Sequence, residues 1–148
     1  MFEFPKLTIA AISGYVLGGG FDLAVLCHLR VASKTAIFGH PEIGFGATPL
    51  FFPYMALIGR GKALELVLNT ARRENFINAE EAYRLNIINK LVEPENILNE
   101  AINLAKQINK SPKLAISILL KVNNAFFNQY KAFETEIDVA VKNMAIVN

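Results

Sequence analysis

Apolar positions dominate the chain up to Gly59 and set its predicted order of elements. A run of apolar and β-branched residues at positions 7–12 ends at Ser13 and Gly14. Such a run is typical of a strand buried on both faces, and therefore of a parallel sheet. Three glycines follow, and residues 21–29 then carry apolar side chains at helical spacing. The pattern predicts a strand, a glycine turn and a helix, in that order.

Further short strands are predicted over residues 30–33 and 36–38, and a last one over residues 87–92. Residues 40–46 predict an irregular loop carrying Glu42, because proline and glycine stand too close together there for regular structure. The pattern becomes helical from Leu50, with helices over residues 53–58 and 62–69. Another helix opens at residue 79, with Asn78 as its side-chain cap.

The remainder of the chain predicts helices over residues 94–108, 112–127 and 130–144, the first two with a proline near the first turn. We find no internal repeat and no low-complexity linker. Strands joined by crossover helices and followed by a helical tail indicate the α/β fold class, as a core of short strands with a helical C-terminal extension.

Charge is distributed unevenly between these parts. Up to Gly59 the charged residues are few, namely Glu3, Lys6, Asp22, Arg30, Lys34 and Glu42, whereas the rest of the chain is densely charged. Residues 1–59 are so apolar that they must be buried on more than one side, either by further chain or by another subunit.

Composition narrows the classes of function. With 148 residues, 53% of them hydrophobic, the chain suits one compact domain. A net charge of +2 without a basic run argues against a nucleic-acid partner. One cysteine and two histidines supply neither a disulfide nor a zinc-type ligand set, so we expect no metal site. No signal-peptide or membrane-span pattern is present, and we expect a soluble cytoplasmic protein with no membrane partner.

The turn formed by Gly18, Gly19 and Gly20 is the first candidate for chemistry. Glycines before a helix let a ligand approach backbone N–H groups, which can hold a phosphate or a carbonyl oxygen that becomes negative during reaction. A purely structural tight turn is an equally good reading of the turn taken alone. Neither the dinucleotide-binding nor the P-loop glycine spacing is met, so an oxyanion hole fits better than a nucleotide loop.

Residues 9–24 read IAAISGYVLGGGFDLA, and this stretch resembles the enoyl-CoA hydratase/isomerase family of the crotonase-like superfamily. Matching segments continue in the same order with LRVAS, AIFGHPEIG, GKALELVL and AEEA. The resemblance runs from about Lys6 to Val92, and a co-linear set of this kind is far more specific than one motif.

The resemblance implies a crotonase-like fold, with residues 1–92 as a partial α/β core and residues 93–148 as a helical oligomerisation region. It assigns an oxyanion N–H to Gly19 and the catalytic carboxylates to Asp22 and Glu42. The remaining residues that it places against the substrate are Leu17, Gly18, Gly20, Pro41 and Gly44. It implies an acyl-CoA substrate, no cofactor besides the coenzyme A of that substrate, and a homo-oligomer, as a trimer or hexamer.

The reaction implied by the resemblance is water addition to a 2-enoyl-CoA. Two carboxylates hold the water, and the oxyanion N–H groups hold the enolate. Double-bond isomerisation with Glu42 alone as proton shuttle stays open, because Asp22 is one methylene shorter than glutamate. A non-catalytic remnant that binds a thioester or a partner also stays open. Taken singly, Asp22 is an ordinary first-turn helix residue and Glu42 an ordinary solvated carboxylate.

Departures from the family pattern add further expectations. The family carries a section before Leu7 with early strands, part of the coenzyme A site and a second oxyanion N–H, so we do not expect an active isolated monomer. Residues 50–54 are more apolar than the run that many family members carry there, and they predict a more apolar wall of the substrate pocket. His28, where aspartate is usual, is expected to act in packing or beside the helix dipole rather than in chemistry.

Overall fold

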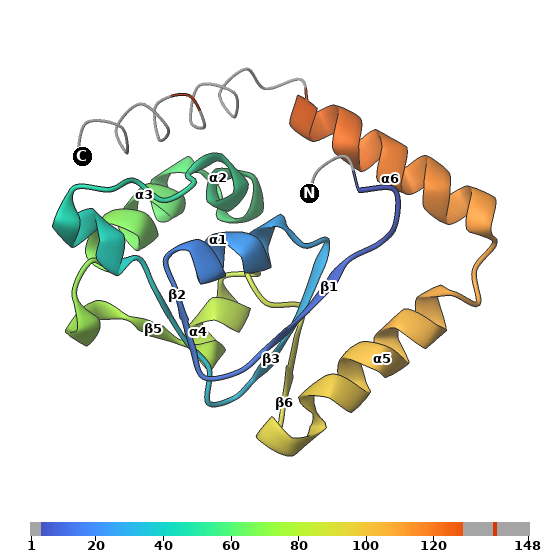
Figure 1. Ribbon diagram of the computed structural model, residues 1–148, viewed down its shortest axis with the longest axis horizontal. Helices are drawn as coiled ribbons and strands as arrows, with labels where there is room; N and C mark the ends of the chain where they lie inside the picture. Colours follow the sequence, from blue (N-terminus) through green and yellow to red (C-terminus); the bar gives the residue numbers. More distant parts are fainter. Residues whose placement is uncertain (1–3, 129–137, 139–148) are drawn as a thin grey trace.

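The computed structural model describes residues 4–128 and residue 138. Within this part of the chain, two small three-stranded sheets are connected by helices (Figure 1). One sheet is parallel and has the order β1 (Ile9–Ile12), β3 (Leu29–Ser33), β6 (Lys90–Val92). The other has the order β2 (Tyr15–Leu17), β4 (Ile37–Gly39), β5 (Ile77–Asn78), with β2 and β4 parallel and β5 antiparallel. The predicted parallel pairing of the first strand is confirmed.

Helices cover and extend these sheets. The α-helices are α1 (Gly19–Leu26), α2 (Phe52–Ile58), α3 (Arg60–Asn69), α4 (Ala79–Arg84), α5 (Ile97–Ile108) and α6 (Lys113–Asn128). The described residues also form the short 3₁₀ helices η1 (Pro41–Phe45), η2 (Arg73–Asn75) and η3 (Pro94–Asn96). The predicted cap of α4 is confirmed, because the Asn78 side chain accepts a hydrogen bond of 2.9 Å from the N–H of Glu81.

Three predictions about individual elements need correction. The segment expected as an irregular loop is the 3₁₀ helix η1, since Pro41 begins it and Gly46, at φ +82°, ends it. The strand expected over residues 87–92 is paired only as β6, because the buried segment before it is held by Arg30, whose Nε donates to the carbonyl of Ile87. In β1, Ala11 is exposed, because it faces an open groove between β1, α5 and α6 rather than a packed layer. The helix expected over residues 130–144 lies outside the described residues except for residue 138.

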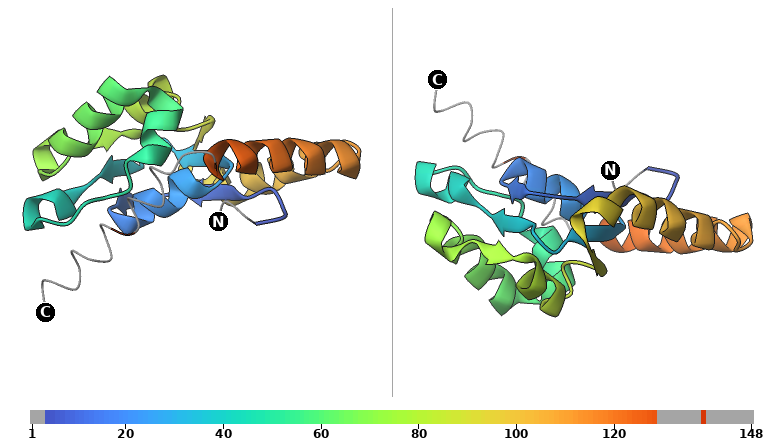
Figure 2. Two further views of the ribbon diagram at one scale, coloured as in Figure 1. Left: turned by 90° about the horizontal axis from the view of Figure 1, so that it is seen from above. Right: turned by 90° about the horizontal axis from the view of Figure 1, so that it is seen from below.

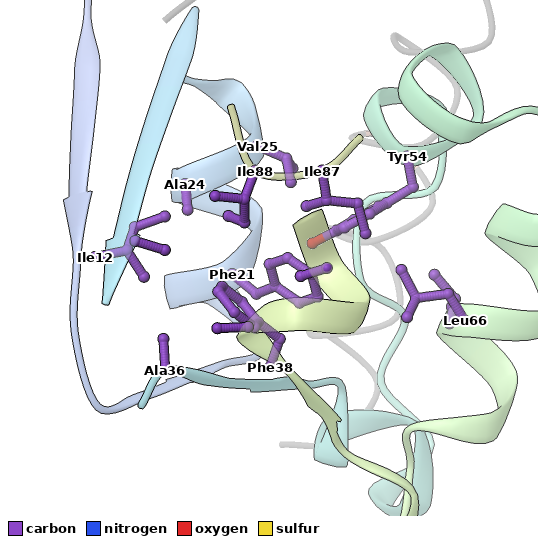
Figure 3. Packing of buried hydrophobic residues seen from close by; sticks show 14 of the residues in the cluster. Ile12, Phe21, Ala24, Val25, Ala36, Phe38, Tyr54, Leu66, Ile87 and Ile88 are labelled. Carbon is purple, nitrogen blue, oxygen red and sulfur yellow. The ribbon is translucent and has the colours of Figure 1, made fainter. Parts of the chain in front are cut away.

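The main core fixes α1 between β4 and α2. The rings of Phe21 and Phe38 lie 5.1 Å apart, and Tyr54 meets Phe21 edge-on at 5.0 Å. Figure 3 shows Phe21 beside Phe38, with Tyr54 reaching toward them from α2. Because all three side chains are fully buried, the start of α1 has little freedom to move relative to β4 and α2.

The helices α5 and α6 lie on the other side of the molecule. In α5, Ile97 and Ala101 pack on the parallel sheet against Val31 and Val92. Figure 1 and both views in Figure 2 show α5 and α6 projecting together beyond the sheets. Both helices leave large apolar side chains exposed, among them Leu98, Ile102, Leu114, Ile118, Leu119 and Val122.

Candidate active site

The glycine turn presents two backbone N–H groups at the start of α1. Gly18 is the residue before the helix, with φ +52°, and its N–H donates to the carbonyl of Gly39 at 3.0 Å. Its own carbonyl accepts from the N–H groups of Phe21 and Asp22, at 2.8 and 3.0 Å. The N–H groups of Gly19 and Gly20 belong to the first helical turn, where no intrahelical acceptor exists. They are therefore available to a ligand at the positive end of α1.

The three glycines differ in what surrounds them. A Cβ built on Gly18 would lie 3.0 Å from Oε2 of Glu42, so this glycine lets the carboxylate approach the turn. At Gly19 and Gly20 no atom of the described chain lies within 4 Å of such a Cβ, and their φ angles are not positive. Neither packing nor backbone conformation requires glycine at those two positions.

Glu42 comes to this turn from η1. Its Oε1 lies 3.1 Å from Nδ1 of His40, which is fully buried. Its Oε2 is buried and has no hydrogen-bond partner among the described residues. A buried carboxylate oxygen is costly to leave unpaired. This oxygen is consequently suited to receive a hydrogen bond from a bound ligand.

Asp22 comes from α1 and is held by two donors. The hydroxyl of Tyr54 donates to Oδ1 at 2.9 Å, and the N–H of Leu50 donates to Oδ2 at 3.2 Å. Burial raises the pKa of Asp22 above its ordinary value, and this effect outweighs the two hydrogen bonds, which lower it. Tyr54 also packs edge-on against His40, with ring centroids 4.9 Å apart, and His40 contacts Glu42, so a chain of buried contacts links the two carboxylates.

The fold thus brings Asp22, Glu42 and the glycine turn together from separate elements. Of the other predicted site residues, Leu17 ends β2 and pairs with Gly39 of β4. Pro41 stands at the start of η1, directly before Glu42. Gly44 lies on the same short helix, where an added Cβ would be 3.8 Å from the carbonyl of Ala71.

Two contributors to the site were not predicted from the sequence. His40 entered only as part of the segment before Glu42, and Tyr54 only as part of an apolar pocket wall. That wall is different in the structure, because Phe52 and Tyr54 lie in the core and Tyr54 turns its hydroxyl to Asp22. The signal available in the sequence was a tyrosine within a stretch predicted to be apolar, because the hydroxyl of a buried tyrosine needs a hydrogen-bond partner.

His28 has a structural role, as expected. Its Nδ1 accepts a hydrogen bond from the N–H of Thr8 at 3.1 Å and lies 2.7 Å from the Thr8 hydroxyl. The N–H of His28 in turn donates to that hydroxyl at 3.1 Å. These contacts tie the start of β1 to the turn after α1.

Other features of the described residues lie away from the carboxylates. A groove of about 680 Å³ is bounded by β1, α5 and α6, and neither Asp22 nor Glu42 lines it. Within residues 4–128, together with residue 138, no cluster of three or more His, Cys, Asp or Glu side chains is placed to hold a metal ion. No helix in that part of the chain is long and apolar enough to cross a membrane.

Comparison with known proteins decides the family. The model of the enoyl-CoA hydratase/isomerase family matches residues 1–146. The chain belongs to the enoyl-CoA hydratase/isomerase family. The match includes the glycine turn and both carboxylates, so the site described above lies within the segment that defines membership.

Named relatives of this family member share much of its sequence. It is 40% identical over 139 residues to a crotonyl-CoA hydratase of Syntrophomonas wolfei, covering 92% of this chain and 50% of that protein. It is 36% identical over 139 residues to a short-chain-enoyl-CoA hydratase of Clostridium acetobutylicum, covering 92% of this chain and 49% of that protein. The chain spans about half the length of these curated relatives.

Solved structures confirm the predicted fold class. An enoyl-CoA hydratase of Mycobacterium smegmatis superposes with a TM-score of 0.84 at 24% identity, over 97% of this chain and 66% of that one. This likeness shows the fold. The α/β architecture of the family member is crotonase-like, as the resemblance implied.

Proposed function

We propose that the chain supplies the acid–base carboxylates and an oxyanion N–H of an enoyl-CoA hydratase. The substrate is a 2-enoyl-CoA thioester, whose coenzyme A is part of the substrate, and the reaction requires no further cofactor. The observation that carries the proposal is that two carboxylates, from α1 and η1, are linked through Tyr54 and His40 beside the open glycine turn. The names of the two relatives, both hydratases, support the same reaction.

The oxyanion role belongs to Gly19. Glycine costs a helix about 1 kcal/mol relative to alanine, so two glycines that the fold does not require point to a ligand lying against them. The space beside Gly19 and Gly20 admits a thioester carbonyl close to their N–H groups. Those groups, at the positive end of α1, stabilise the negative charge that develops on the carbonyl oxygen.

The carboxylates handle the protons of water addition. The water oxygen forms a bond to C3 of the enoyl group, and one carboxylate takes the proton that the water loses. The electron pair of the C2=C3 bond moves into the enolate, and a carboxyl group of the pair then delivers a proton to C2, so that one proton is taken from water and one is returned. Glu42 has the unpartnered Oε2 next to the turn, and Asp22 has a pKa raised by burial, which suits it to exchange a proton nearer neutral pH.

Substrate contacts follow from the same turn. Leu17 ends β2 and Gly18 precedes α1, so both lead directly into the N–H groups of Gly19 and Gly20. Pro41 and Gly44 belong to η1, the element that carries Glu42. We assign Leu17, Gly18, Gly20, Pro41 and Gly44 to the wall around the thioester, while residues 50–54 serve the site by holding Asp22.

Assembly is the remaining part of the proposal. Residues 1–92 are assigned to the core, and residues 93–148 to the oligomerisation region of a homo-oligomer, a trimer or hexamer. Supporting this, α5 and α6 expose several large apolar side chains, of which Leu114 and Leu119 are 73% and 69% exposed. We place the protein in the cytoplasm, in keeping with its single cysteine.

Turnover of two thioesters by the purified chain, in the oligomer that it forms, tests the function. Crotonyl-CoA reports hydration through loss of its conjugated double bond, with the hydroxyacyl product identified by mass spectrometry. We expect hydration, slowed about a hundredfold or more by Glu42→Gln.

A 3-enoyl-CoA separates the alternatives. Gain of conjugation that survives Asp22→Asn would instead indicate an isomerase that uses Glu42 alone. A folded oligomer that converts neither thioester would overturn the proposed function and leave the non-catalytic reading.

A further inference from the structure

His40 is fully buried beside the proposed site, yet the reaction above gives it no task. Its Nδ1 lies 3.1 Å from Oε1 of Glu42. The tautomer with its proton on Nδ1 donates to this oxygen, because an ionised carboxylate only accepts hydrogen bonds. Its Nε2 has no partner among the described residues. A neutral ring leaves one lone pair unpaired there, whereas a doubly protonated ring would bury an N–H without an acceptor, at greater cost.

The position of the His40 ring is fixed from several sides. The N–H of His40 donates to the carbonyl and the hydroxyl of Thr70, at 3.0 and 3.2 Å. The ring stacks on Phe21, with centroids 5.0 Å apart and planes 16° apart. Tyr54 meets it edge-on at 4.9 Å. A donor held this firmly can fix the orientation of whatever accepts its hydrogen bond.

We propose that His40 is a positioning residue that holds Oε1 of Glu42 and thereby directs Oε2 to the glycine turn. The geometry supports this, since Oε2 is the oxygen that lies 3.0 Å from the Cβ position of Gly18. The same group of buried rings also orients the second carboxylate, because Tyr54 packs on His40 and donates a hydrogen bond to Asp22. The inference rests on the proposed function for its kinetic consequence, and on the structure alone for the hydrogen bond.

Two substitutions at this position separate orientation from packing. His40→Phe keeps an aromatic ring between Phe21 and Tyr54 but removes the donor. His40→Asn places an amide nitrogen near the position of Nδ1 but removes most of the ring. A merely structural histidine would be replaced better by phenylalanine, and a positioning histidine better by asparagine.

Kinetics and stability of the two variants are the main test. For His40→Phe we expect kcat on crotonyl-CoA to fall about tenfold to a hundredfold with little change in KM, since misplacement of a catalytic group has effects of this order. His40→Asn should have a lower thermal midpoint than His40→Phe and nevertheless retain more of kcat. The reverse order of kcat, or a change confined to KM, would overturn the proposal.

A measurement without substrate distinguishes this inference from the proposed function. Long-range ¹H–¹⁵N NMR spectra of the wild-type chain should show His40 with the proton on Nδ1 and none on Nε2. The opposite tautomer overturns the inference whatever the activity is. If the expected tautomer is found in a chain that hydrates no thioester, the positioning contact stands and the proposed function has failed.

Discussion

At the scale of single residues, Gly18 and Gly19 are neighbours that need glycine for different reasons. Gly18 has φ +52° and ψ −126°, a conformation that other residues adopt only with strain, and a Cβ at this position would lie 3.0 Å from Oε2 of Glu42. Gly19 has an ordinary helical position with open space where its side chain would be. Glycine at position 18 is required by the fold, whereas glycine at position 19 leaves space for the proposed ligand.

Alanine at each position should separate these two demands. Gly18→Ala is expected to lower the free energy of unfolding by about 1–3 kcal/mol. Gly19→Ala should leave stability unchanged or raise it by up to about 1 kcal/mol, while lowering turnover of crotonyl-CoA. Chemical denaturation and the enoyl-CoA assay measure the two quantities. Full turnover by Gly19→Ala would show that no ligand lies against this position, which would contradict the proposed oxyanion site.

The hydrogen bond from Tyr54 to Asp22 makes a second residue-scale prediction. Because this bond lowers a pKa that burial raises, Tyr54→Phe should raise the pKa of Asp22 further. A raised carboxyl pKa contributes stability below the unfolded value, which is lost as pH rises through the folded value. The variant should therefore lose more stability at pH 7 than at pH 4. At pH 7 we expect the free energy of unfolding to fall by about 1.5–3 kcal/mol, the usual contribution of a hydrogen bond to a charged group.

Carbon-13 NMR titration of the Asp22 carboxyl and denaturation at the two pH values measure these effects. Tyr83→Phe is the matched control, since Tyr83 is 50% exposed on α4. An unshifted Asp22 titration in Tyr54→Phe would show that the hydroxyl does not hold the carboxylate in solution.

The glycine turn and the two carboxylates were predictable because local spacing and a co-linear family pattern expose them. His40 and Tyr54 were not, because their roles depend on tertiary contacts. Tyr54 reaches Asp22 across a separation of 32 residues, and His40 is anchored by Thr70 across 30. No local periodicity carries information about contacts of that kind.

At the scale of elements, the link between β1 and the end of α1 depends on one histidine. His28 accepts at Nδ1 from Thr8, which requires that nitrogen to be unprotonated. Burial, with a smaller effect from the charge of Arg30, lowers the pKa of His28. A lowered histidine pKa gives stability that is present above its ordinary value of about 6.5 and is lost as pH falls through the folded value.

We therefore expect the denaturation midpoint of the chain to fall as pH is lowered from 7 to 5. The dependence should be weaker in His28→Asn, which cannot gain a proton in that range. His40→Asn serves as the comparison, because it removes the other histidine of the chain. Equal pH dependence of the wild type and His28→Asn would exclude this link as the cause.

Element boundaries were predicted less well where tertiary packing overrides the local pattern. Pro41 and Gly46 indicated an irregular loop, yet they begin and end a 3₁₀ helix that aims Glu42 at the turn. Residues 87 and 88 are apolar because they are buried beside Arg30, rather than because they belong to a strand. Capping of α4 by Asn78 was predictable, since it involves residues only three apart.

At the scale of the whole molecule, the placement of the helices α5 and α6 beyond the sheets is the feature that the sequence predicted least. Their apolar periodicity indicated helices, but the groove that they enclose with β1 arises only from their packing. The α/β class followed from the order of strands and helices and the crotonase-like fold from the family pattern, and the superposition with an enoyl-CoA hydratase confirms the fold.

The proposed assembly predicts a change of mass for one surface substitution. Leu119 on α6 is 69% exposed. Leu119→Glu should lower the mass of the assembly without lowering the thermal midpoint. Tyr83→Glu, at another exposed apolar side chain on α4, should leave the assembly intact. Size-exclusion chromatography with light scattering measures both, and equal masses for the two variants would argue against α6 as an interface.

The central claim is that Asp22 and Glu42 act as one unit on one substrate, and a double-mutant cycle on crotonyl-CoA hydration tests it most directly. Asp22→Asn and Glu42→Gln should each lower kcat roughly 10²- to 10⁴-fold. Because groups that act together are not additive, the double variant should be about as slow as the slower single variant. Unchanged kcat in either single variant, or losses that multiply fully in the double variant, would contradict the account.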